Sequence, residues 1–537
     1  MEEKKYILLV NDIKLPINAS YKEAFSVARK KIKSTGIFSD GMRFSIYRRS
    51  VDARKRDNIF FVYSVSVEVD GLLPDVDFLK SRGIGVINDN TRLCLAHGTV
   101  PIKNPPVVVG SGPAGMFCAL MLAEEGYRPI VIERGGSIKE RLSKVSRFNK
   151  ERILDENTNI QFGAGGAGTF SDGKLVTRTN DPLISYVLSR LVDFGAPESI
   201  KYIAKPHIGT DVLSPLVDGI LERITELGGK VIYNTTFKKP IFSGDRVVCA
   251  STTIGDIATD ALVLAIGHSA RDTYFGLMDA GLTVEPKDFS VGMRIEHLTE
   301  DIDRALYGKF AGDPALGHAE YNLSYDTSAR GVYTFCMCPG GEVVAATSES
   351  GAVVVNGMSN SKRNGINSNS AVLASVFKSD YGNTPYSAID FQKKIERAAF
   401  VAGGSDYRVP LITVGDFLSD KLSALPKRVL PTYMDGAYKL ARPEEYLPTF
   451  ATDAIKRALL GFDKKISGFA ASDAILSGAE TRTSAPIRIL RDNATRLAVG
   501  YDNLYPAGEG AGYAGGITSA AVDGIKTAIS IIGKYKV

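Results

Sequence analysis

The chain contains no tryptophan, only five histidines and five cysteines, and no strong excess of charge among its 537 residues. The small, odd number of cysteines indicates reduced thiols rather than a disulfide framework. No stretch approaches about 18 uninterrupted apolar residues, so the sequence predicts no membrane-spanning helix. The first ten residues lack the longer apolar core of a signal peptide, and we therefore expect a cytoplasmic protein.

The formal net charge is only +5, and residues 1–70 account for all of it with 14 basic and 9 acidic groups. A dedicated nucleic-acid-binding protein usually carries a much stronger basic footprint. Residues 48–56 hold five basic groups between two β-rich stretches, 42–47 and 59–69. This segment is either a solvated hairpin connection or a docking site for a polyanion or a partner protein.

Glycine is the residue in excess, with 53 copies, or about 10% against an average of roughly 7%. Thirteen of these glycines lie in the windows 110–115, 163–173 and 508–516. Each window contains the pattern Gly-x-Gly-x-x-Gly, which is weak evidence by itself and depends on its context.

The first copy has the context of a dinucleotide-binding loop. An apolar strand at 107–109 precedes it, a helical pattern follows it, and Glu133 ends the next strand. In this arrangement Gly110 permits a tight turn, Gly112 lets the backbone approach a pyrophosphate, and Gly115 lets helix and strand pack closely. The helix N-terminus then faces the phosphates, and the Glu133 carboxylate accepts hydrogen bonds from the ribose hydroxyls.

The other two copies cannot form such a unit alone. No helix is expected directly after the second, which either wraps a ligand closely or is a flexible loop. The third, at 510–515, follows a strand and precedes a helix that begins near Ile517. Because the chain ends 22 residues after this copy, we interpret it as the last strand and helix of the first unit.

These loops, together with Val-Ile-Glu-Arg-Gly at 131–135, Ala-Ile-Gly at 265–267 and Gly-Glu at 508–509, resemble the glutathione-reductase-type FAD-binding fold. More narrowly, the chain resembles a family of bacterial FAD-dependent dehydrogenases described as NAD(FAD)-utilising. The segments that carry this resemblance are 163–175, 291–297, 334–341, 480–484 and 508–516.

The resemblance implies an α/β fold with a Rossmann-like FAD-binding domain that is split by an inserted mixed α+β substrate domain. A small N-terminal α+β domain of ferredoxin-like type precedes it. The expected boundaries are 1–100 for the N-terminal domain, 101–285 and 481–537 for the two parts of the FAD-binding domain, and 286–480 for the insertion.

It also implies bound FAD, with contacts from all three loops and from the strand ends between them. The expected cofactor-binding residues are Gly110, Gly112, Pro113, Ala114, Gly115, Glu133, Arg134, Gly165, Gly166, Phe237, Gly267, Gly508, Glu509, Gly515, Gly516 and Ile517. Glu509 stands where many relatives of the broad fold have Asp, which preserves the charge.

The residues that act on the substrate are less evident. Lys174 either attracts an anionic substrate or a flavin oxygen, or forms a surface salt bridge; His268 is either a general acid or a hydrogen-bonding loop residue. Cys336 and Cys338 lack Cys-x-x-Cys spacing and form either two packed thiols or a strained disulfide. We expect no metal site, because no second Cys/His pair has suitable spacing.

The leading hypothesis is an FAD-dependent oxidoreductase that acts on an unidentified small molecule. We expect its electrons to come from a separate donor protein or from transiently bound NAD(P)H. One alternative is a flavin-dependent enzyme that modifies RNA, with residues 48–56 as the docking site, and another is a non-catalytic FAD-binding protein.

Overall fold

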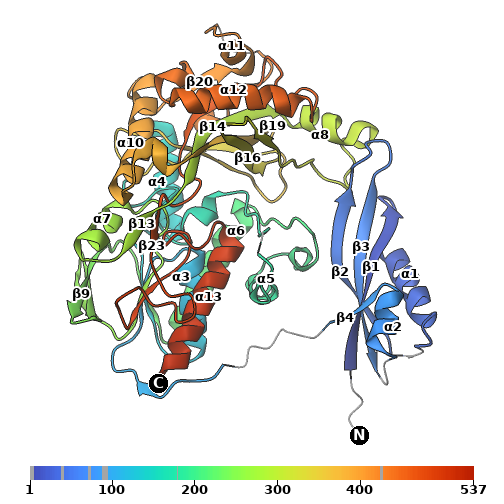
Figure 1. Ribbon diagram of the computed structural model, residues 1–537, viewed down its shortest axis with the longest axis horizontal. Coiled ribbons are helices and arrows are strands. Elements are labelled where there is room, and N and C mark those ends of the chain that lie inside the picture. Colours follow the sequence, from blue (N-terminus) through green and yellow to red (C-terminus); the bar gives the residue numbers. More distant parts are fainter. Residues whose placement is uncertain (1–4, 38–40, 71–73, 88–94, 178, 424–426) are drawn as a thin grey trace.

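A computed structural model describes residues 5–37, 41–70, 74–87, 95–177, 179–423 and 427–537 (Figure 1). The chain contains a parallel sheet with helices between its strands, together with other sheets that also carry helices. The expected α/β character is therefore confirmed. Within the described residues, no helix has the length and apolar character needed to cross a membrane.

The N-terminal segment folds around a four-stranded antiparallel sheet in the order β2-β3-β1-β4. Its elements follow one another as βαββαβ, the element order of ferredoxin-like domains. They are β1 (Lys5–Pro16), α1 (Tyr21–Lys33), β2 (Arg43–Asp52), β3 (Phe60–Asp70), α2 (Val76–Ser81) and β4 (Ile84–Ile87). The sheet, blue in Figure 1, stands to one side of the larger body.

The basic segment differs from the expectation, because half of it is strand rather than connection. The strand expected at 42–47 continues to Asp52 as β2, where Arg48 pairs with Ser64 of β3. Arg49 donates its N–H to the carbonyl of Tyr202 (2.7 Å), and Ala204 donates to the carbonyl of Arg49 (2.8 Å). The ladder and these two bonds satisfy backbone groups that a solvated loop would leave to water.

The second part is a five-stranded parallel sheet in the order β24-β12-β6-β7-β8. Its strands are β6 (Val107–Val109), β7 (Ile130–Ile132), β8 (Lys230–Ile232), β12 (Leu262–Leu264) and β24 (Leu504–Pro506). The central strands are apolar throughout, as is typical of parallel strands covered on both faces. The last strand comes from the far end of the chain and pairs beside β12.

Helices and a smaller sheet surround this parallel sheet. The helices are α3 (Pro113–Glu124), α4 (Ile138–Glu151), α5 (Leu183–Asp193), α6 (Thr210–Glu226), α7 (Arg271–Asp279) and α13 (Ile517–Lys534). The smaller, antiparallel sheet consists of β9 (Phe237–Ser243), β10 (Arg246–Thr252) and β11 (Gly255–Ala258). In Figure 1 the red helix α13 runs beside α3, which is apolar and buried over nearly its whole length.

A seven-stranded sheet forms the upper part of the body in Figure 1, in the order β15-β16-β19-β14-β22-β20-β21. The strands are β14 (Phe289–Leu298), β15 (Ser324–Asp326), β16 (Gly331–Cys338), β19 (Asn367–Val376), β20 (Val409–Thr413), β21 (Tyr438–Leu440) and β22 (Ile475–Glu480). Its helices are α8 (Thr299–Tyr307), α9 (Lys378–Tyr381), α10 (Pro385–Ala402), α11 (Val414–Leu418) and α12 (Thr449–Asp463).

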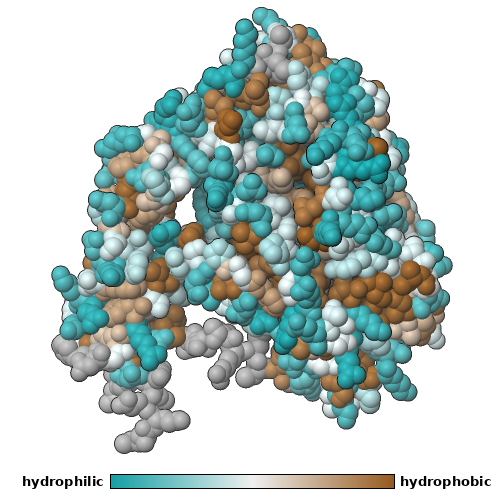
Figure 2. Space-filling model, turned by 180° about the vertical axis from the view of Figure 1, so that it is seen from behind, coloured by the Kyte–Doolittle hydropathy of each residue, from teal (hydrophilic) through white to brown (hydrophobic). Residues whose placement is uncertain are grey.

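Three two-stranded pairs complete the structure. They are β13 (Val284–Pro286) with β23 (Ile487–Ile489), β17 (Glu342–Ala345) with β18 (Val355–Met358), and β5 (Val100–Pro101) with β25 (Tyr535–Lys536). The pair β13–β23 lies where the chain enters and leaves the seven-stranded sheet. On the face seen in Figure 2, hydrophilic side chains cover much of the surface, with hydrophobic patches between them.

The packing of α13 on α3 depends on a glycine. A Cβ at Gly524 would lie 2.0 Å from the carbonyl oxygen of Ala114, whereas one at Gly533, in the last turn of the same helix, would meet only the Ala96 carbonyl oxygen, at 3.9 Å. We expect Gly524→Ala to lower the free energy of unfolding by about 1–3 kcal/mol, because the helices must separate.

Gly533→Ala is the matched control and should be neutral or raise the free energy of unfolding by up to about 1 kcal/mol through helix propensity. Urea denaturation measures both. Equal effects of the two substitutions would contradict the proposed close contact.

Candidate functional site

A cavity of about 330 Å³ lies where the carboxyl ends of the parallel strands face the seven-stranded sheet. Open α/β sheets bind ligands at this edge. Most of the predicted site residues line it: Gly110, Gly112, Pro113, Ala114, Glu133, Arg134, Gly166, Lys174, Phe237, Gly267, His268, Glu509, Gly515, Gly516 and Ile517. Gly115, Gly165 and Gly508 are not among its lining residues.

The first glycine loop adopts a conformation that side chains would obstruct. Gly110 has a φ of 98°, and a Cβ there would lie 2.3 Å from the carbonyl oxygen of Ala265. A Cβ at Gly115 would lie 1.9 Å from the carbonyl oxygen of Gly110. Gly115 therefore lets α3 begin directly against the turn, and its contribution is to packing rather than to the cavity wall.

The second glycine loop lies against the first. Gly166 has a φ of 63°, and a Cβ there would be 2.9 Å from the Cα of Gly112. The loop continues into a short 3₁₀ helix, η1 (Ala167–Phe170), where no helix was expected. The two loops thus form adjacent parts of one wall, although their first glycines, Gly110 and Gly163, lie 53 positions apart in the sequence.

Sequence reasoning missed Arg141, which holds this second loop in place. Its guanidinium is fully buried and donates to the carbonyls of Asn159 (2.8 Å), Ile160 (2.6 Å) and Ala164 (2.7 Å). It also lies over the ring of Phe170, 4.8 Å from the centroid. A signal existed, because Arg141 occupies the apolar face of the amphipathic helix α4.

Glu133 lies at the end of β7, and its carboxylate joins three segments. One oxygen accepts from the N–H and the hydroxyl of Ser111 (2.9 and 2.7 Å), and the other accepts from the N–H groups of Gly135 (3.0 Å) and Gly163 (2.9 Å). These four bonds use the usual acceptor capacity of a carboxylate. A ribose hydroxyl would bind this carboxylate by replacing one of them, and ribose binding by Glu133 stays a prediction.

Two other predicted contacts flank Glu133. Arg134 forms an ion pair with Asp272 (2.7 Å) and lies over the ring of Phe162, 4.6 Å from its centroid. Phe237 is buried at the start of β9 and lines the cavity near Thr235, whose N–H donates to the Glu133 carbonyl (2.9 Å).

The third glycine loop is held in place by a hydrogen bond to a buried ion pair. Gly508 donates its N–H to Asp523 (2.8 Å), which also binds Arg491 (2.7 Å). In contrast, Gly515 and Gly516 have no atom within 4 Å of the position a Cβ would take. The backbone is therefore open to the cavity just before α13 begins at Ile517.

Both α3 and α13 begin at the cavity, with Gly112 and Gly516 as their N-cap residues. The first N–H groups of a helix have no intrahelical partner, and the helix dipole adds positive potential there. The cavity thus offers two binding positions for negatively charged groups.

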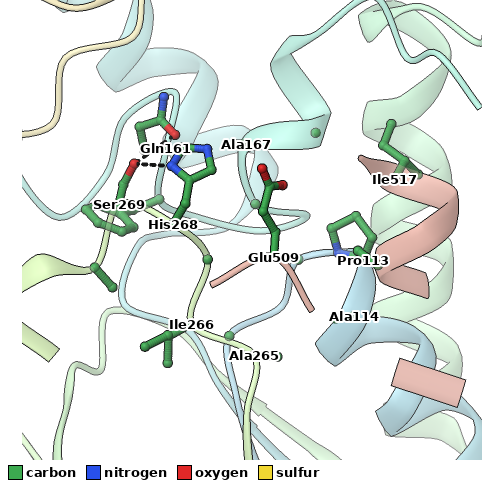
Figure 3. A pocket seen from close by; sticks show the side chains of 18 of the residues that line it. Pro113, Ala114, Gln161, Ala167, Ala265, Ile266, His268, Ser269, Glu509 and Ile517 are labelled. Atoms are coloured by element: carbon green, nitrogen blue, oxygen red, sulfur yellow. Dashed lines mark hydrogen bonds between the residues drawn. The ribbon is translucent and has the colours of Figure 1, made fainter. Parts of the chain in front are cut away.

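His268 stands across the cavity from Pro113 and Ile517, with Glu509 between them (Figure 3). The hydroxyl of Ser269 donates to Gln161 (3.2 Å), so the hydrogen bond between Ser269 and the Nδ1 of His268 (3.0 Å) takes its proton from the histidine. Burial, together with Arg482 and Arg271, lowers the pKa of His268 to about 3. The imidazole is therefore neutral and presents Nε2 as an acceptor, which fits a hydrogen-bonding residue better than a general acid.

Lys174 forms an ion pair with Asp172 (2.8 Å) and a hydrogen bond with the carbonyl of Met337 on β16. Asp172 is fully buried and also binds Arg363. Although burial opposes the charged form, Asp172, Glu320 and Cys338 raise the pKa of Lys174. The lysine is thus a charged residue of the cavity wall, joined to the seven-stranded sheet and not a surface salt bridge.

Two acidic residues of the cavity lie in surroundings that disfavour their charge. Burial raises the pKa of Glu509 to about 7, with Lys287 and the N–H of Gly516 partly offsetting it. Burial likewise raises the pKa of Glu480 to about 7 despite its ion pair with Arg294 (2.7 Å). Both lie in segments that carry the sequence resemblance, 291–297 and 480–484, although neither was expected to bind the cofactor.

Comparison with protein families identifies two parts of this site. A family described as "FAD-dependent protein, C-terminal domain-like" matches residues 288–483, and an "FAD binding domain" family matches residues 106–142. A domain of unknown function matches residues 8–68. An uncharacterized protein of Clostridium beijerinckii (strain ATCC 51743 / NCIMB 8052) is 44% identical over 532 residues, covering 97% of this chain and 98% of that protein.

The chain belongs to the family of this clostridial protein. The FAD binding domain match in this chain covers the first glycine loop and Glu133. An NADH:fumarate oxidoreductase of Klebsiella pneumoniae (strain 342) is 23% identical over 205 residues, which cover 32% of this chain and 21% of that protein.

Solved structures resemble the family fold only distantly. Glycine oxidase from Bacillus cereus aligns over 81% of this chain and 98% of its own, with 10% identity and a TM-score of 0.32. L-amino acid deaminase from Proteus vulgaris aligns over 82% and 96%, with 14% identity and a TM-score of 0.33. Similarity of this degree gives no argument about a substrate.

The buried guanidinium of Arg141 permits a direct test of the second loop. Arg141→Met would remove the guanidinium donor from three buried carbonyls, of which that of Ala164 keeps the Thr169 hydroxyl (3.3 Å), so we expect the free energy of unfolding to fall by at least about 2 kcal/mol. Arg147→Met, on the exposed side of the same helix, removes only an ion pair with Glu151 and should cost less than about 0.5 kcal/mol. Similar losses for both variants, measured by urea denaturation, would contradict this role.

The raised pKa of Glu509 predicts a pH-dependent effect of Glu509→Gln. The folded state holds the proton up to about pH 7, whereas the unfolded chain loses it near the ordinary glutamate pKa of 4.5. Stability from the protonated group is therefore present at low pH and lost as the pH rises through 7. In flavin-free protein, we expect the variant to gain stability relative to the wild type as the pH rises from about 5 to about 8. An unchanged difference across this range, measured by urea denaturation, would refute the assignment.

Proposed function

We propose that the protein is an FAD-dependent oxidoreductase that acts on a polar small molecule and receives or donates electrons through a separate partner. The observation that carries this proposal is the convergence of three glycine loops and two helix N-termini on one cavity. The opposite wall of that cavity comes from the seven-stranded sheet and carries charged side chains.

The chemistry of the wall fits FAD in two parts. Near α3, the open backbone at Gly112 and the free N–H groups of the first turn suit a pyrophosphate. Near α13, Gly515 and Gly516 leave space that a Cβ would fill. Bound there, FAD would supply hydride or electron transfer, while the protein contributes position, electrostatics and proton handling.

The chain's own groups have separable tasks in this proposal. The N-terminus of α13, with Ile517 on the cavity wall, would stabilise negative charge beside it. Glu509, whose pKa is about 7, can hold or release a proton at its carboxylate near neutral pH. His268 offers an acceptor at Nε2.

The substrate end of the cavity is lined by residues of the other sheet. Glu480 of β22 lies on this wall with Arg482, which follows β22, and Asn356 of β18, while Lys174 reaches it from the second glycine loop, so the wall has both cationic and acidic groups. Such a wall favours a polar or ionised small molecule over an apolar one.

The alternative of a flavoprotein acting on RNA receives less support from the basic hairpin. Arg54 is paired with Asp52 (2.6 Å), and Arg56 donates to the carbonyl of Ala305 (3.2 Å). The Arg56 contact and the backbone bonds of Arg49 join the hairpin to the body, whereas the Arg54 pair lies within the hairpin. Fewer of its cations are therefore available to phosphates.

FAD binding can be tested with a substitution that fills the cavity and spares the fold. Gly515→Val places a side chain in open space and should weaken FAD binding at least about tenfold, equal to 1.4 kcal/mol, with little loss of stability. Gly533→Val, at the exposed end of α13, is the control and should bind FAD as the wild type does. Fluorescence titration of the flavin-free proteins measures both.

The wild-type protein is expected to show a flavin absorbance spectrum that bleaches when a reductant is added and recovers with an acceptor. Protein that binds no FAD would overturn the proposal. Full FAD occupancy without reduction by any electron donor would favour the non-catalytic alternative.

A further inference from the structure

The two cysteines of β16 lie on and directly behind the cavity wall. Cys336 lines the cavity, whereas Cys338 is fully buried. Both are free thiols in this structure, as the packed-thiol interpretation of the sequence expects. No step described so far uses them.

A β-bulge gives Cys336 its position. Phe335 pairs with Ala371 and Cys338 with Asn369, so three steps along β16 match two along β19. Within this bulge Cys336 has a φ of 43°, a left-handed conformation that residues other than glycine rarely adopt. Bulges commonly redirect side chains next to active sites. This bulge interrupts the alternation of side chains along β16 at the point where the strand reaches the cavity.

The spacing also permits a bond between the two sulfurs. Residues two apart in a regular strand have Cα atoms about 6.6 Å apart, close to the upper limit for a disulfide. The Cys338 sulfur lies 3.3 Å from the carbonyl oxygen of Cys336, and the two thiols are within hydrogen-bonding reach of each other.

The charges around the pair differ for the two thiols. Arg294 donates to the Cys336 carbonyl (3.0 Å) and lies 3.9 Å from the Cys338 sulfur, and Lys174 binds the carbonyl of Met337 between them. The hydrogen bond between the two thiols lowers the pKa of Cys336 despite its burial, and the positive charges of Arg294 and Lys174 lower it further. The same hydrogen bond, together with burial, raises the pKa of Cys338.

The acidic groups that face the pair are already neutralised in part. Asp172 is paired with Lys174, and Glu480 is paired with Arg294. The accessible thiol therefore has thiolate character, whereas the buried one stays protonated. This is the asymmetry that thiol–disulfide exchange requires of an attacking and a resolving cysteine.

We propose that Cys336 and Cys338 form a redox-active dithiol that reduces a low-molecular-weight disulfide in this cavity. The Cys336 thiolate attacks one sulfur of the substrate, a mixed disulfide forms, and the other substrate sulfur leaves as a thiolate. The Cys338 thiol then loses its proton to a departing thiolate and attacks the Cys336 sulfur. An internal disulfide forms, and the second substrate thiol is released.

The second step becomes favourable because of the first. The negative charge on Cys336 is one cause of the raised pKa of Cys338, and it disappears once Cys336 is bonded. The nearby Arg294 then favours the Cys338 thiolate. In one exchange the dithiol itself supplies the two electrons that reduce the substrate disulfide, so no other reductant is needed. The return of the Cys336–Cys338 disulfide to the dithiol rests on the proposed FAD-dependent function.

The reactivity of Cys336 can be measured on the wild-type protein, after its flavin content has been recorded from the absorbance spectrum. The protein is treated with iodoacetamide between about pH 5.5 and 8.5, and each cysteine is followed by peptide mass spectrometry. At about pH 6 we expect Cys336 to react at least about tenfold faster than the partly exposed Cys249. Cys118, whose pKa is raised by burial, should react slowest.

The contribution of Lys174 has its own control. Lys174→Met should shift the pH midpoint of Cys336 alkylation upward, whereas Lys205→Met, which changes an exposed lysine near Glu320, should leave it unchanged. A midpoint unaffected by Lys174→Met would remove the lysine from the argument and weaken the assignment of the thiolate.

The exchange step is tested with 2-hydroxyethyl disulfide. The mass of the wild-type protein should fall by two hydrogens as the internal disulfide forms. Cys338→Ser should accumulate a mixed disulfide on Cys336, and Cys336→Ser should accumulate none. The control Cys249→Ser should behave as the wild type does. Equal alkylation of Cys336 and Cys249, or no adduct in Cys338→Ser, would overturn the inference even where the flavin spectrum is intact. Absence of flavin with a reactive Cys336 would instead contradict the proposed function alone.

Discussion

The carboxylate of Glu133 is the constraint on which the rest of the cavity depends. Its four hydrogen bonds join the turn after β6, the end of β7 and the start of the second glycine loop. Because charge-assisted bonds are stronger than neutral ones, one acidic side chain holds backbone segments that have few side chains of their own to pack. Arg141 does the same from the other side, as a buried donor to three carbonyls. The Glu133 carboxylate and the Arg141 guanidinium thus fix the conformation of glycine-rich loops that would otherwise have no preferred conformation.

Glycine and charge have complementary effects in this site. The glycines allow backbones to approach within distances that a Cβ forbids, as at Gly115 against Gly110 and Gly166 against Gly112. The buried charges then select one arrangement among those the glycines permit. The consequence is a cavity with a backbone-lined end, suited to phosphates, and a side-chain-lined end, suited to reaction chemistry.

The parallel strands and the helices after the first and third glycine loops could be predicted from local patterns, since apolar triplets such as 107–109 and the adjoining helical periodicity lie close together in the sequence. Most predicted cofactor contacts lie on the cavity for the same reason. That the Glu133 carboxylate has its acceptor positions filled within the protein could not be predicted, because one of its donors, the N–H of Gly163, comes from a loop 30 residues later in the sequence. The sequence drew attention to Cys336 but could not place its side chain at the cavity, because a bulge in β16, and not the alternation of the strand, decides where it lies. The extension of β2 to Asp52 depends on bonds to Tyr202 and Ala204, which no local pattern contains.

The pairing of β24 with β12 has a consequence for biosynthesis. Strand β24 begins at Leu504, and α13 follows it to Lys534, so the parallel sheet gains this strand only after the long segment that follows β12 has been synthesised. Until then β12 presents an unpaired edge, and α3 lacks the helix that covers it. Unpaired strand edges and exposed apolar surface make nascent chains prone to aggregation. The candidate cofactor site therefore cannot close until residues 504–534 have left the ribosome, long after its first glycine loop has done so.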